Sequence, residues 1–368
     1  MVLVPKHIQD LNPYDPGRPI EDVMQEFGLK RVIKLASNEN PLGVSPHSLQ
    51  ALMGSFHQIN RYPDIASKIL RTKLAQIHKL QMENIITGHG SEAVMSVAIR
   101  TLLFNGDEVL TSEGTFVGLY VMVKAMDVKL VTVPLKDYRY DLEAIAAAVT
   151  DKTRIIYLAN PNNPTGNSFT KSEFEVFIKN IPQDIIIILD EAYFEFVDGN
   201  PDFPDSMTYR LDNALTLRTF SKAYGLAGIR LGYGMGNAEL IKNIMKVRLP
   251  FEPGVPSQMA GVAALNDHQF LNYYLELNRN GLRYLYKVYD RLGIQYVKSD
   301  TNFVMSIYDS EETANKIVKR LMEKGVIVRG LRPFGLPHCI RVTVGLEEEN
   351  QIYAEKLEEV LQELNLIL

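Results

Sequence analysis

Residues 219–232 read Thr-Phe-Ser-Lys-Ala-Tyr-Gly-Leu-Ala-Gly-Ile-Arg-Leu-Gly and place one lysine, Lys222, among small residues and hydroxyls. A lysine amine becomes a nucleophile near neutral pH when an apolar setting lowers its pKa. Arg230 follows eight residues later, and its guanidinium would suit a phosphate group, together with the hydroxyls of Thr219 and Ser221. The segment indicates chemistry on a molecule with a carbonyl and a phosphate. Taken alone, it could equally be a Gly-rich turn with a surface lysine.

Two further clusters follow predicted strands. Gly88-His89-Gly90-Ser91-Glu92 opens a helix, where backbone N–H groups and the helix dipole favour a phosphate. It lacks the third glycine of the dinucleotide fingerprint and the Gly-Lys-Ser/Thr ending of a Walker A loop. Asn163 lies in Asn160-Pro161-Asn162-Asn163-Pro164-Thr165-Gly166, where two X-Pro pairs would hold its amide in place. A bare turn is the alternative interpretation.

Asp190 directly follows the apolar run 184–189. A carboxylate at a buried strand end needs a partner, and a protonated pyridine nitrogen is one candidate. The alternative is an Asp that caps the next turn. Because ligands collect at the carboxyl ends of strands in open α/β sheets, we expect all four clusters to meet there. Together they indicate pyridoxal phosphate, which has an aldehyde, a ring nitrogen and a phosphate.

The elements that must position these clusters alternate between strands and helices. Several of the strands are continuous apolar runs, which are typical of strands covered by helices on both faces. The pattern predicts a mostly parallel central sheet. The candidate strands are 84–87, 108–111, 129–133, 154–158, 184–189, 214–218 and 232–234, and the candidate helices are 92–103, 116–125, 142–149 and 171–181.

The ends of the chain have a different pattern. We expect a short helix over 20–27 capped by Gly28, and another within 65–80. Beyond residue 256 a helical region, 257–292, leads into strands from 295, over 326–329 and over 339–343, and then into a helix over 348–364. We therefore predict an N-terminal arm (1–30), a smaller α+β domain (31–55 and 255–368) and a large cofactor-binding domain (56–254).

Composition excludes several classes of protein. A net charge of −5 over 368 residues argues against a nucleic-acid binder, and the apolar runs are too short to span a membrane. No secretory signal is visible at the N-terminus. The single cysteine, Cys339, allows no intrachain disulfide and no Cys-based metal cluster. We expect a cytoplasmic protein without a metal.

Nearly the whole chain resembles the fold type I (aspartate aminotransferase-like) pyridoxal phosphate enzymes, and within them the histidinol-phosphate aminotransferases. The resemblance implies a large domain with a mostly parallel seven-stranded sheet and a smaller α+β domain. Five of the motifs recur across aminotransferases, and the first two point to the histidinol-phosphate branch. The motifs are Pro13-Tyr14-x-Pro-Gly-Arg-Pro, Lys34-Leu-Ala-Ser-Asn-Glu-Asn-Pro-Leu-Gly43, Arg61-Tyr62-Pro63, Asn162-Asn-Pro-Thr-Gly166, Asp190-Glu-Ala-Tyr193, Ser221-Lys222 and Arg341-Val-Thr-Val-Gly345.

The resemblance implies a role for each matching position around the cofactor ring. Lys222 would be the Schiff-base lysine, and Asp190 would pair with the ring nitrogen. Asn163 and Tyr193 would hold the phenolic oxygen, and Phe116 would stack on the ring. The phosphate ligands implied are Ser91 and Glu92 (through backbone N–H), Thr219, Ser221, Arg230 and, from the neighbouring subunit of a homodimer, Tyr62.

For the substrate, the resemblance implies that Arg341 grips a carboxylate or phosphate. Arg329 and Tyr14 would complete the pocket, and Asn38 would lie beside it. The alternative for Arg329 is a solvated charge, and for Tyr62 an aromatic at the edge of the core.

Two departures from the family pattern affect the cofactor site. The segment Ser91-Glu92-Ala93 stands where Ser/Ala-Asp-Glu is usual, and Phe116 stands where Tyr is more common. Phe116 keeps the aromatic face but loses a hydroxyl. Both departures bear on substrate more than on cofactor binding.

The implied activity is a ping-pong amino transfer from a small-molecule donor, histidinol phosphate, to a 2-oxo acid such as 2-oxoglutarate. An aromatic-amino-acid aminotransferase or a threonine-phosphate decarboxylase would share most of these residues. A cofactor-sensing regulator would need an N-terminal helix-turn-helix, for which the predicted arm has no room.

Overall fold

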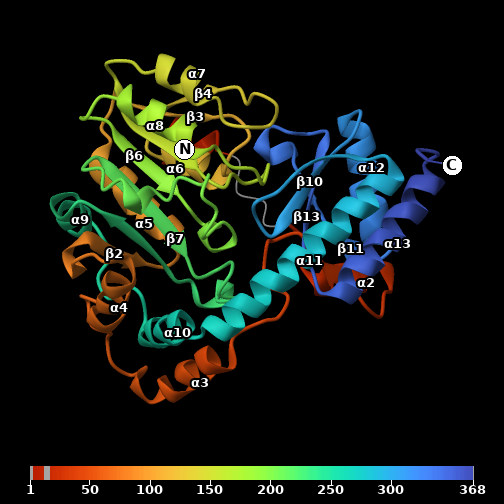
Figure 1. Ribbon diagram of the computed structural model, residues 1–368, viewed down its shortest axis with the longest axis horizontal. Coiled ribbons are helices and arrows are strands. Elements are labelled where there is room, and N and C mark those ends of the chain that lie inside the picture. Colours follow the sequence, from red (N-terminus) through yellow and green to blue (C-terminus); the bar gives the residue numbers. More distant parts are fainter. Residues whose placement is uncertain (1–2, 12–16, 368) are drawn as a thin grey trace.

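The structure is a computed structural model that describes residues 3–11 and 17–367. It has two lobes joined by the long helix α11 (His268–Leu292) (Figure 1). The larger lobe holds a seven-stranded sheet, in which only β8 runs antiparallel to its neighbours. The predicted mostly parallel sheet is confirmed. Its strands in spatial order are β2 (Ile85–Gly88), β8 (Gly232–Gly236), β7 (Ala214–Thr219), β6 (Ile186–Asp190), β5 (Thr153–Ala159), β3 (Glu108–Ser112) and β4 (Lys129–Val133).

Helices cover both faces of this sheet, which explains its continuous apolar strands. In β5, Ile155 and Tyr157 pack under α5, α6 and α9, whereas Ile156 and Leu158 pack under α7 and α8. Alternate residues of one strand therefore enter two different cores. The bounds of these helices are α5 (Ser91–Leu102), α6 (Val117–Ala125), α7 (Leu142–Ala147), α8 (Lys171–Lys179) and α9 (Ala238–Met245).

A third layer lies beside β2 and β8 and consists of α3 (Pro46–Gly54), α4 (Lys68–His78) and α10 (Val255–Asn266). Ala260 and Ala264 of α10 share a core with Leu70 and Phe220. The predicted domain boundary at residue 255 thus falls at the start of a helix whose buried side chains pack on the larger lobe. The exact division of the chain into domains stays a prediction.

The predicted helical region 257–292 is divided in two at Asp267. This residue leaves the helical conformation, and its carboxylate accepts a hydrogen bond from Phe270 N at 3.2 Å, which caps α11. The same carboxylate accepts a hydrogen bond from Ser45, ahead of α3. Asp267 thereby fixes the bend at which the chain leaves α10 and enters the helix between the lobes.

The smaller lobe is α+β, as predicted. Its antiparallel sheet has the order β12-β13-β10-β9, and β1 pairs in parallel with β11. The predicted helix over 20–27 is α2, and it ends at Gly28 with φ +64°. The elements are α2 (Ile20–Phe27), β1 (Ile33–Lys34), β9 (Gln295–Val297), β10 (Phe303–Ile307), α12 (Glu311–Glu323), β11 (Val326–Ile327), β12 (Arg329–Gly330), β13 (Cys339–Thr343) and α13 (Glu347–Glu363).

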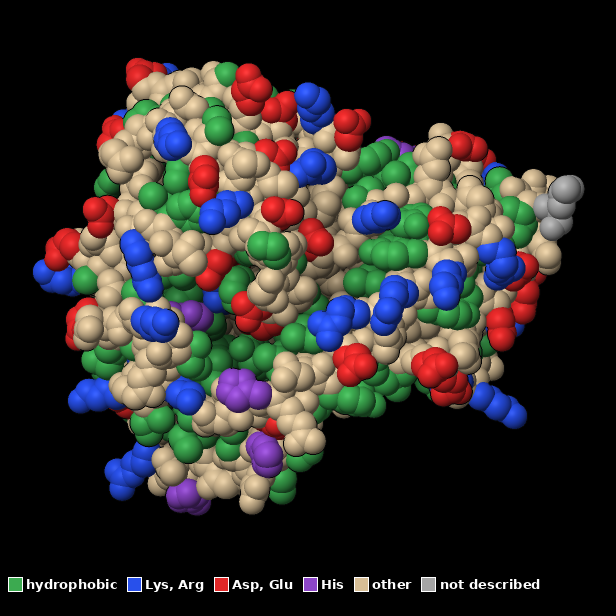
Figure 2. All heavy atoms as spheres, viewed as in Figure 1, with side chains coloured by type: hydrophobic (Ala, Val, Ile, Leu, Met, Phe, Trp, Pro, Cys, Tyr) green, Lys and Arg blue, Asp and Glu red, His purple; other side chains and the backbone are tan. Residues whose placement is uncertain are grey.

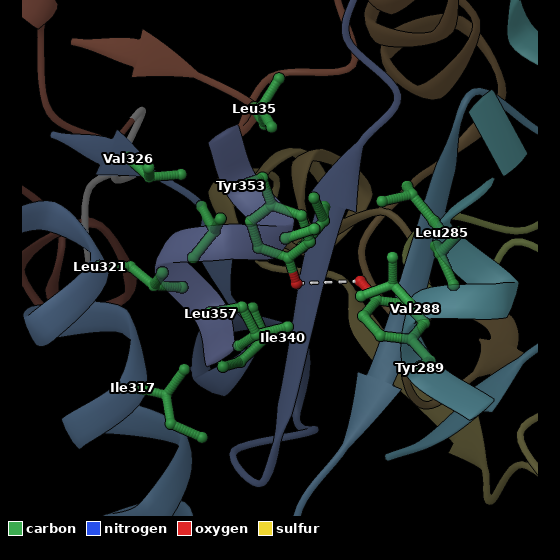
Figure 3. Packing of buried hydrophobic residues seen from close by; sticks show 14 of the residues in the cluster. Leu35, Leu285, Val288, Tyr289, Ile317, Leu321, Val326, Ile340, Tyr353 and Leu357 are labelled. Atoms are coloured by element: carbon green, nitrogen blue, oxygen red, sulfur yellow. Dashed lines mark hydrogen bonds between the residues drawn. The ribbon is translucent and has the colours of Figure 1, made fainter. Parts of the chain in front are cut away.

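The core of the smaller lobe is built from β10, β13 and helices α11 to α13 (Figure 3). Leu285 and Val288 of α11 face Tyr353 and Leu357 of α13 across this core. The hydroxyls of Tyr289 and Tyr353 hydrogen-bond at 3.0 Å, so both buried phenols are satisfied.

Short elements complete the chain. The helix α1 (Lys6–Gln9) contacts α6. No helix in the described ranges is long and apolar enough to cross a membrane. The 3-10 helices are Phe56–Gln58, Met82–Asn84, Phe194–Phe196, Ser206–Thr208, Ala227–Ile229 and Arg332–Phe334.

Candidate active site

A pocket of about 300 Å³ opens at the carboxyl edge of the large sheet. The segments that follow β2, β3, β5, β6 and β7 reach this edge together, and β8 begins there. The structure thus brings together side chains that lie far apart in the sequence. The predicted residues that line this pocket are Ser91, Glu92, Phe116, Asn163, Asp190, Tyr193, Thr219, Ser221, Lys222 and Arg230.

One end of the pocket is suited to a phosphate. Ser91 is the first residue of α5 and lines the pocket, so the free N–H groups at the start of that helix lie at this end of it. Arg230 Nη1 lies 3.4 Å from Ser221 Oγ. A β-carbon on Gly90 would come within 2.9 Å of Arg230 Nη2, and one on Gly232 within 2.1 Å of Ser91 N. Both glycines are therefore needed for this close approach of donors.

Asp190 lies at the last position of β6 and is only 8% exposed. Burial raises the pKa of its carboxyl from 3.8 to about 6. Two hydrogen bonds oppose this rise, one from Tyr157 Oη at 2.7 Å and one from Ala192 N at 3.2 Å. These two bonds stabilise the ionised carboxylate, which could pair with a cationic ring nitrogen.

Lys222 faces the same pocket. Burial, and then the nearby charge of Arg341, lower the pKa of its amine from 10.5 to about 8. Lys222 Nζ donates a hydrogen bond to the carbonyl of Ser37 at 3.2 Å and lies 5.9 Å from the centre of the Tyr193 ring. The lowered pKa favours the neutral amine, which is the nucleophilic form.

The smaller lobe contributes Arg341, which contacts the pocket residue Asn163, and Arg329, which pairs with Arg341 in the sheet. Arg341 of β13 is 5% exposed, donates to Asn163 Oδ1, and donates to the carbonyl of Ala36 at 2.8 Å. Arg329 of β12 is its direct neighbour in the antiparallel pair. Two largely buried arginines at paired positions of the sheet favour an anionic group on the substrate.

Asn38 also lies at this junction of the lobes. Its Nδ2 donates a hydrogen bond to Tyr193 Oη at 2.7 Å, and its own carbonyl accepts one from Asn302 at 3.1 Å. The predicted neighbour of the pocket is therefore in contact with a residue that lines it.

Of the predicted residues that the structure describes, Asn38, Arg329, Arg341 and Tyr62 do not line this pocket. Tyr62 is 80% exposed and stacks on Phe251 at a ring distance of 4.3 Å, so it does not line the pocket of its own chain. Tyr14 lies outside the described residues.

Tyr157, Thr343 and Ser37 contact the predicted site residues but were not among the candidates from sequence. For Tyr157 a signal was available, because it lies two positions before Ala159, which pairs in register with Asp190. Alternation along β5 places Tyr157 on the same face of the sheet as Ala159. The contact of Ser37 joins the two lobes, and that of Thr343 joins distant parts of the chain, so neither leaves a local pattern in the sequence.

The chain is similar to known aminotransferases. The sequence profile of the family described as "Aminotransferase class I and II" matches residues 30–357. A histidinol-phosphate aminotransferase of Moorella thermoacetica is 39% identical over 357 residues, which cover 96% of this chain and 92% of that protein. Histidinol-phosphate aminotransferase 2 of Hydrogenovibrio crunogenus is 40% identical over 362 residues, with 98% and 96% covered.

A solved structure shows the same similarity in three dimensions. The crystal structure of histidinol-phosphate aminotransferase from Sinorhizobium meliloti in complex with pyridoxal-5'-phosphate matches with a TM-score of 0.90 at 30% identity, and 99% of each chain is covered. This match confirms the predicted fold.

Proposed function

The chain belongs to the class I and II aminotransferases, and we propose that it moves an amino group from L-histidinol phosphate to 2-oxoglutarate, giving imidazole acetol phosphate and L-glutamate. One observation carries the proposal: Lys222 and the buried Asp190 share a pocket whose far end is a phosphate cradle. Pyridoxal phosphate fits all three features. Relatives that are 39–40% identical over nearly the full length are histidinol-phosphate aminotransferases, which supports this donor.

Several residues would hold the cofactor. The helix terminus at Ser91, the hydroxyl of Ser221 and the guanidinium of Arg230 would bind its phosphate. Asn163 and Tyr193 would donate to its phenolic oxygen. Phe116 lines the pocket and would pack against the ring. When bound, pyridoxal phosphate supplies an aldehyde and an electron-withdrawing ring.

Asp190 and Lys222 would control where protons lie during the reaction. Asp190 would keep a proton on the ring nitrogen, because the ionised carboxylate is stabilised by that positive charge. Lys222 would hold the cofactor until the donor displaces it. Its amine, with a pKa lowered to about 8, would then take the proton from the donor's Cα.

Substrate binding would depend on the smaller lobe. Arg341 and Arg329 are paired residues of β13 and β12, and their guanidiniums would match a phosphate better than the apolar side chain of an aromatic amino acid. This pair favours histidinol phosphate over phenylalanine as the donor. Tyr14 would complete this pocket from the N-terminal arm.

We also propose a homodimer in which Tyr62 reaches the neighbouring active site. Tyr62 is exposed and stacks on Phe251, and the segments on either side of the two residues carry further exposed apolar side chains. Figure 2 shows hydrophobic side chains gathered around a hollow in the lower left of the view, where Figure 1 places α4 and α10. Exposed patches of this kind mark interfaces. The surface consists of Val44, Leu49, Met53, Phe56, Ile59, Tyr62, Ile65, Ile69, Ile77, Val247, Leu249 and Phe251.

We propose a cytoplasmic location, with 2-oxo acid and amino donor as the small-molecule partners. The chain has one cysteine, Cys339, and it is buried and unpaired. A reducing compartment suits such a thiol.

The test is to add single amino donors to the purified protein loaded with pyridoxal phosphate. Histidinol phosphate, glutamate, phenylalanine and threonine phosphate form the panel, and the absorbance of the bound cofactor reports conversion to its amino form. We expect rapid conversion by histidinol phosphate and glutamate. Conversion by phenylalanine but not histidinol phosphate would contradict the proposed donor, and carbon dioxide release from threonine phosphate would indicate a decarboxylase.

Replacing the lysine provides the second test. K222A should lose amino transfer altogether while it still binds the cofactor through the cradle around Arg230. Substantial turnover by K222A would contradict the proposed role of Lys222.

A further inference from the structure

Three consecutive residues ahead of α3 each contact a different residue of the candidate active site. The carbonyl of Ala36 accepts a hydrogen bond from Arg341 at 2.8 Å, and that of Ser37 accepts one from Lys222 at 3.2 Å. Asn38 Nδ2 donates to Tyr193 Oη at 2.7 Å. The segment 36–38 therefore lies against the groups that would bind substrate and cofactor. Of the three residues in this segment, only Asn38 makes its contact through its own side chain.

The side chain of Asn38 is fixed by Thr343 of β13. Thr343 Oγ1 accepts a hydrogen bond from Asn38 N at 3.0 Å and donates one to Asn38 Oδ1 at 3.1 Å. Because the hydroxyl already accepts from the backbone N–H, its one proton is available for Oδ1. This arrangement turns the amide so that Nδ2, and not Oδ1, faces Tyr193.

The backbone of Asn38 is equally constrained. Its φ is +56°, in the left-handed region, and its carbonyl accepts a hydrogen bond from Asn302 at 3.1 Å. Asn38, Thr343, Tyr193 and Asn302 are each at most 3% exposed, so water does not compete for these bonds. Both polar atoms of the Asn38 side chain are engaged within the protein.

The direction of these bonds has a consequence for Tyr193. Its phenolic oxygen accepts from Asn38, so its own O–H is oriented as a donor. A hydroxyl that accepts a hydrogen bond is polarised and donates a stronger one. We propose that Asn38, oriented by Thr343, is a positioning residue that directs and strengthens the hydrogen bond from Tyr193 to the phenolic oxygen of the cofactor. This inference rests on the proposed function, because it requires bound pyridoxal phosphate.

The inference predicts a change in a property that an ordinary loss of stability would not alter. The phenolic oxygen of the cofactor lies next to the nitrogen that joins it to Lys222. A weaker bond from Tyr193 leaves more negative charge on that oxygen, and this charge favours the proton on the neighbouring nitrogen. The midpoint of the pH titration of the cofactor's absorbance should therefore rise.

Two variants remove the arrangement at different points. T343V keeps the shape of the side chain but breaks both bonds to Asn38, and N38G removes the amide at a φ that glycine accepts. We expect both midpoints to rise by about 0.3 units or more, with N38G the larger, because cooperative strengthening is roughly 10–30% per bond. T343S keeps the hydroxyl and should titrate like the wild type. I340V weakens the packing of the same strand without touching Asn38 and should also leave the midpoint unchanged.

The outcomes separate this inference from the proposed function. If T343V and N38G have the same titration midpoint as the wild type, the inference is wrong while the cofactor assignment stands. If I340V shifts as far as T343V, the effect comes from general loosening of β13, and the inference is again wrong. If the wild-type protein gives no absorbance band of a lysine-bound cofactor at any pH, the proposed function has failed first.

Discussion

Asp190 must stay ionised at a place where burial favours its neutral form. Tyr157, which is fully buried, opposes the burial by donating a hydrogen bond at 2.7 Å to the carboxylate. We expect Y157F to raise the pKa of Asp190 above its value of about 6 by about one to two units, because a hydrogen bond to a charged group contributes roughly 1.5–3 kcal/mol. The acidic limb of the kcat/KM profile should move to higher pH.

A matched control for Y157F is available in the same lobe. Y140F removes another buried hydroxyl, one that bonds Thr115 and the backbone N–H of Ala159 and does not touch Asp190. The acidic limb of the kcat/KM profile of Y140F should lie at the same pH as that of the wild type. A Y157F profile that also stayed there would show that Tyr157 does not tune the carboxylate.

The lowered pKa of Lys222 has its own consequence for pH. Only the neutral amine attacks an aldehyde, and protonation of Lys222 removes that form as the pH falls below about 8. The rate at which the cofactor-free protein takes up pyridoxal phosphate covalently should rise about tenfold per pH unit below 8 and level off above it. Stopped-flow absorbance measures this rate. A plateau beginning only near pH 10 would mean that Lys222 has its ordinary pKa.

Among the elements, β6 and β7 carry the most chemistry and are tied together by a buried ion pair. Arg218 of β7 donates two hydrogen bonds to Glu191 Oε2, at 2.9 and 2.7 Å, and one to Asp205 at 2.9 Å. Its guanidinium also lies 3.2 Å from the centre of the Phe194 ring. Since Glu191 follows Asp190 and Arg218 precedes Thr219, the pair holds together the two strand ends that present the site.

Breaking this pair should be costly because it leaves a buried charge behind. We expect R218M to lower the free energy of unfolding by about 3–5 kcal/mol in urea titrations, and R218M/E191Q to recover much of that loss. K242M, which breaks an exposed pair with Glu239 on α9, should have no measurable effect. An R218M protein as stable as K242M would show that the pair contributes nothing.

The elements also show what could be predicted from the sequence. The strands β3 to β8 are long covered runs, so their positions were predicted to within about two residues. The order of the strands in the sheet was not predicted, because it depends on contacts between residues that are distant in the sequence. β10 was missed although it is apolar, and the division between α10 and α11 was missed because Asp267 acts through a cap and a contact with Ser45.

At the scale of the molecule, the predicted site depends on the meeting of two lobes. Lys222, Asp190 and Asn163 follow strands of one sheet, so their convergence could be predicted from the β/α pattern. Arg341 and Asn38 come from the smaller lobe, and only the resemblance to a family indicated them. Tyr62 lies on the exposed apolar surface, where its predicted role requires a second copy of the chain.

That role can be tested with subunits that fail for different reasons. K222A lacks the reactive amine, and Y62A lacks the residue that would reach the neighbouring phosphate, so each homodimer should be impaired. If Tyr62 acts across the interface, a hybrid dimer has one site with both Lys222 and Tyr62 intact. Mixing the two variants under conditions that exchange subunits should then give about a quarter of wild-type activity, because half the dimers are hybrids with one good site.

The controls for this experiment use the same interface. Co-purification of K222A and Y62A subunits that carry different affinity tags shows that subunits exchange, and light scattering gives the mass of each species. If Tyr62 served its own chain, every site in the hybrid would carry a defect, and the mixture would be no more active than the average of K222A and Y62A measured separately. Recovery above that average therefore requires that Tyr62 of one subunit complete the site around Lys222 of the other.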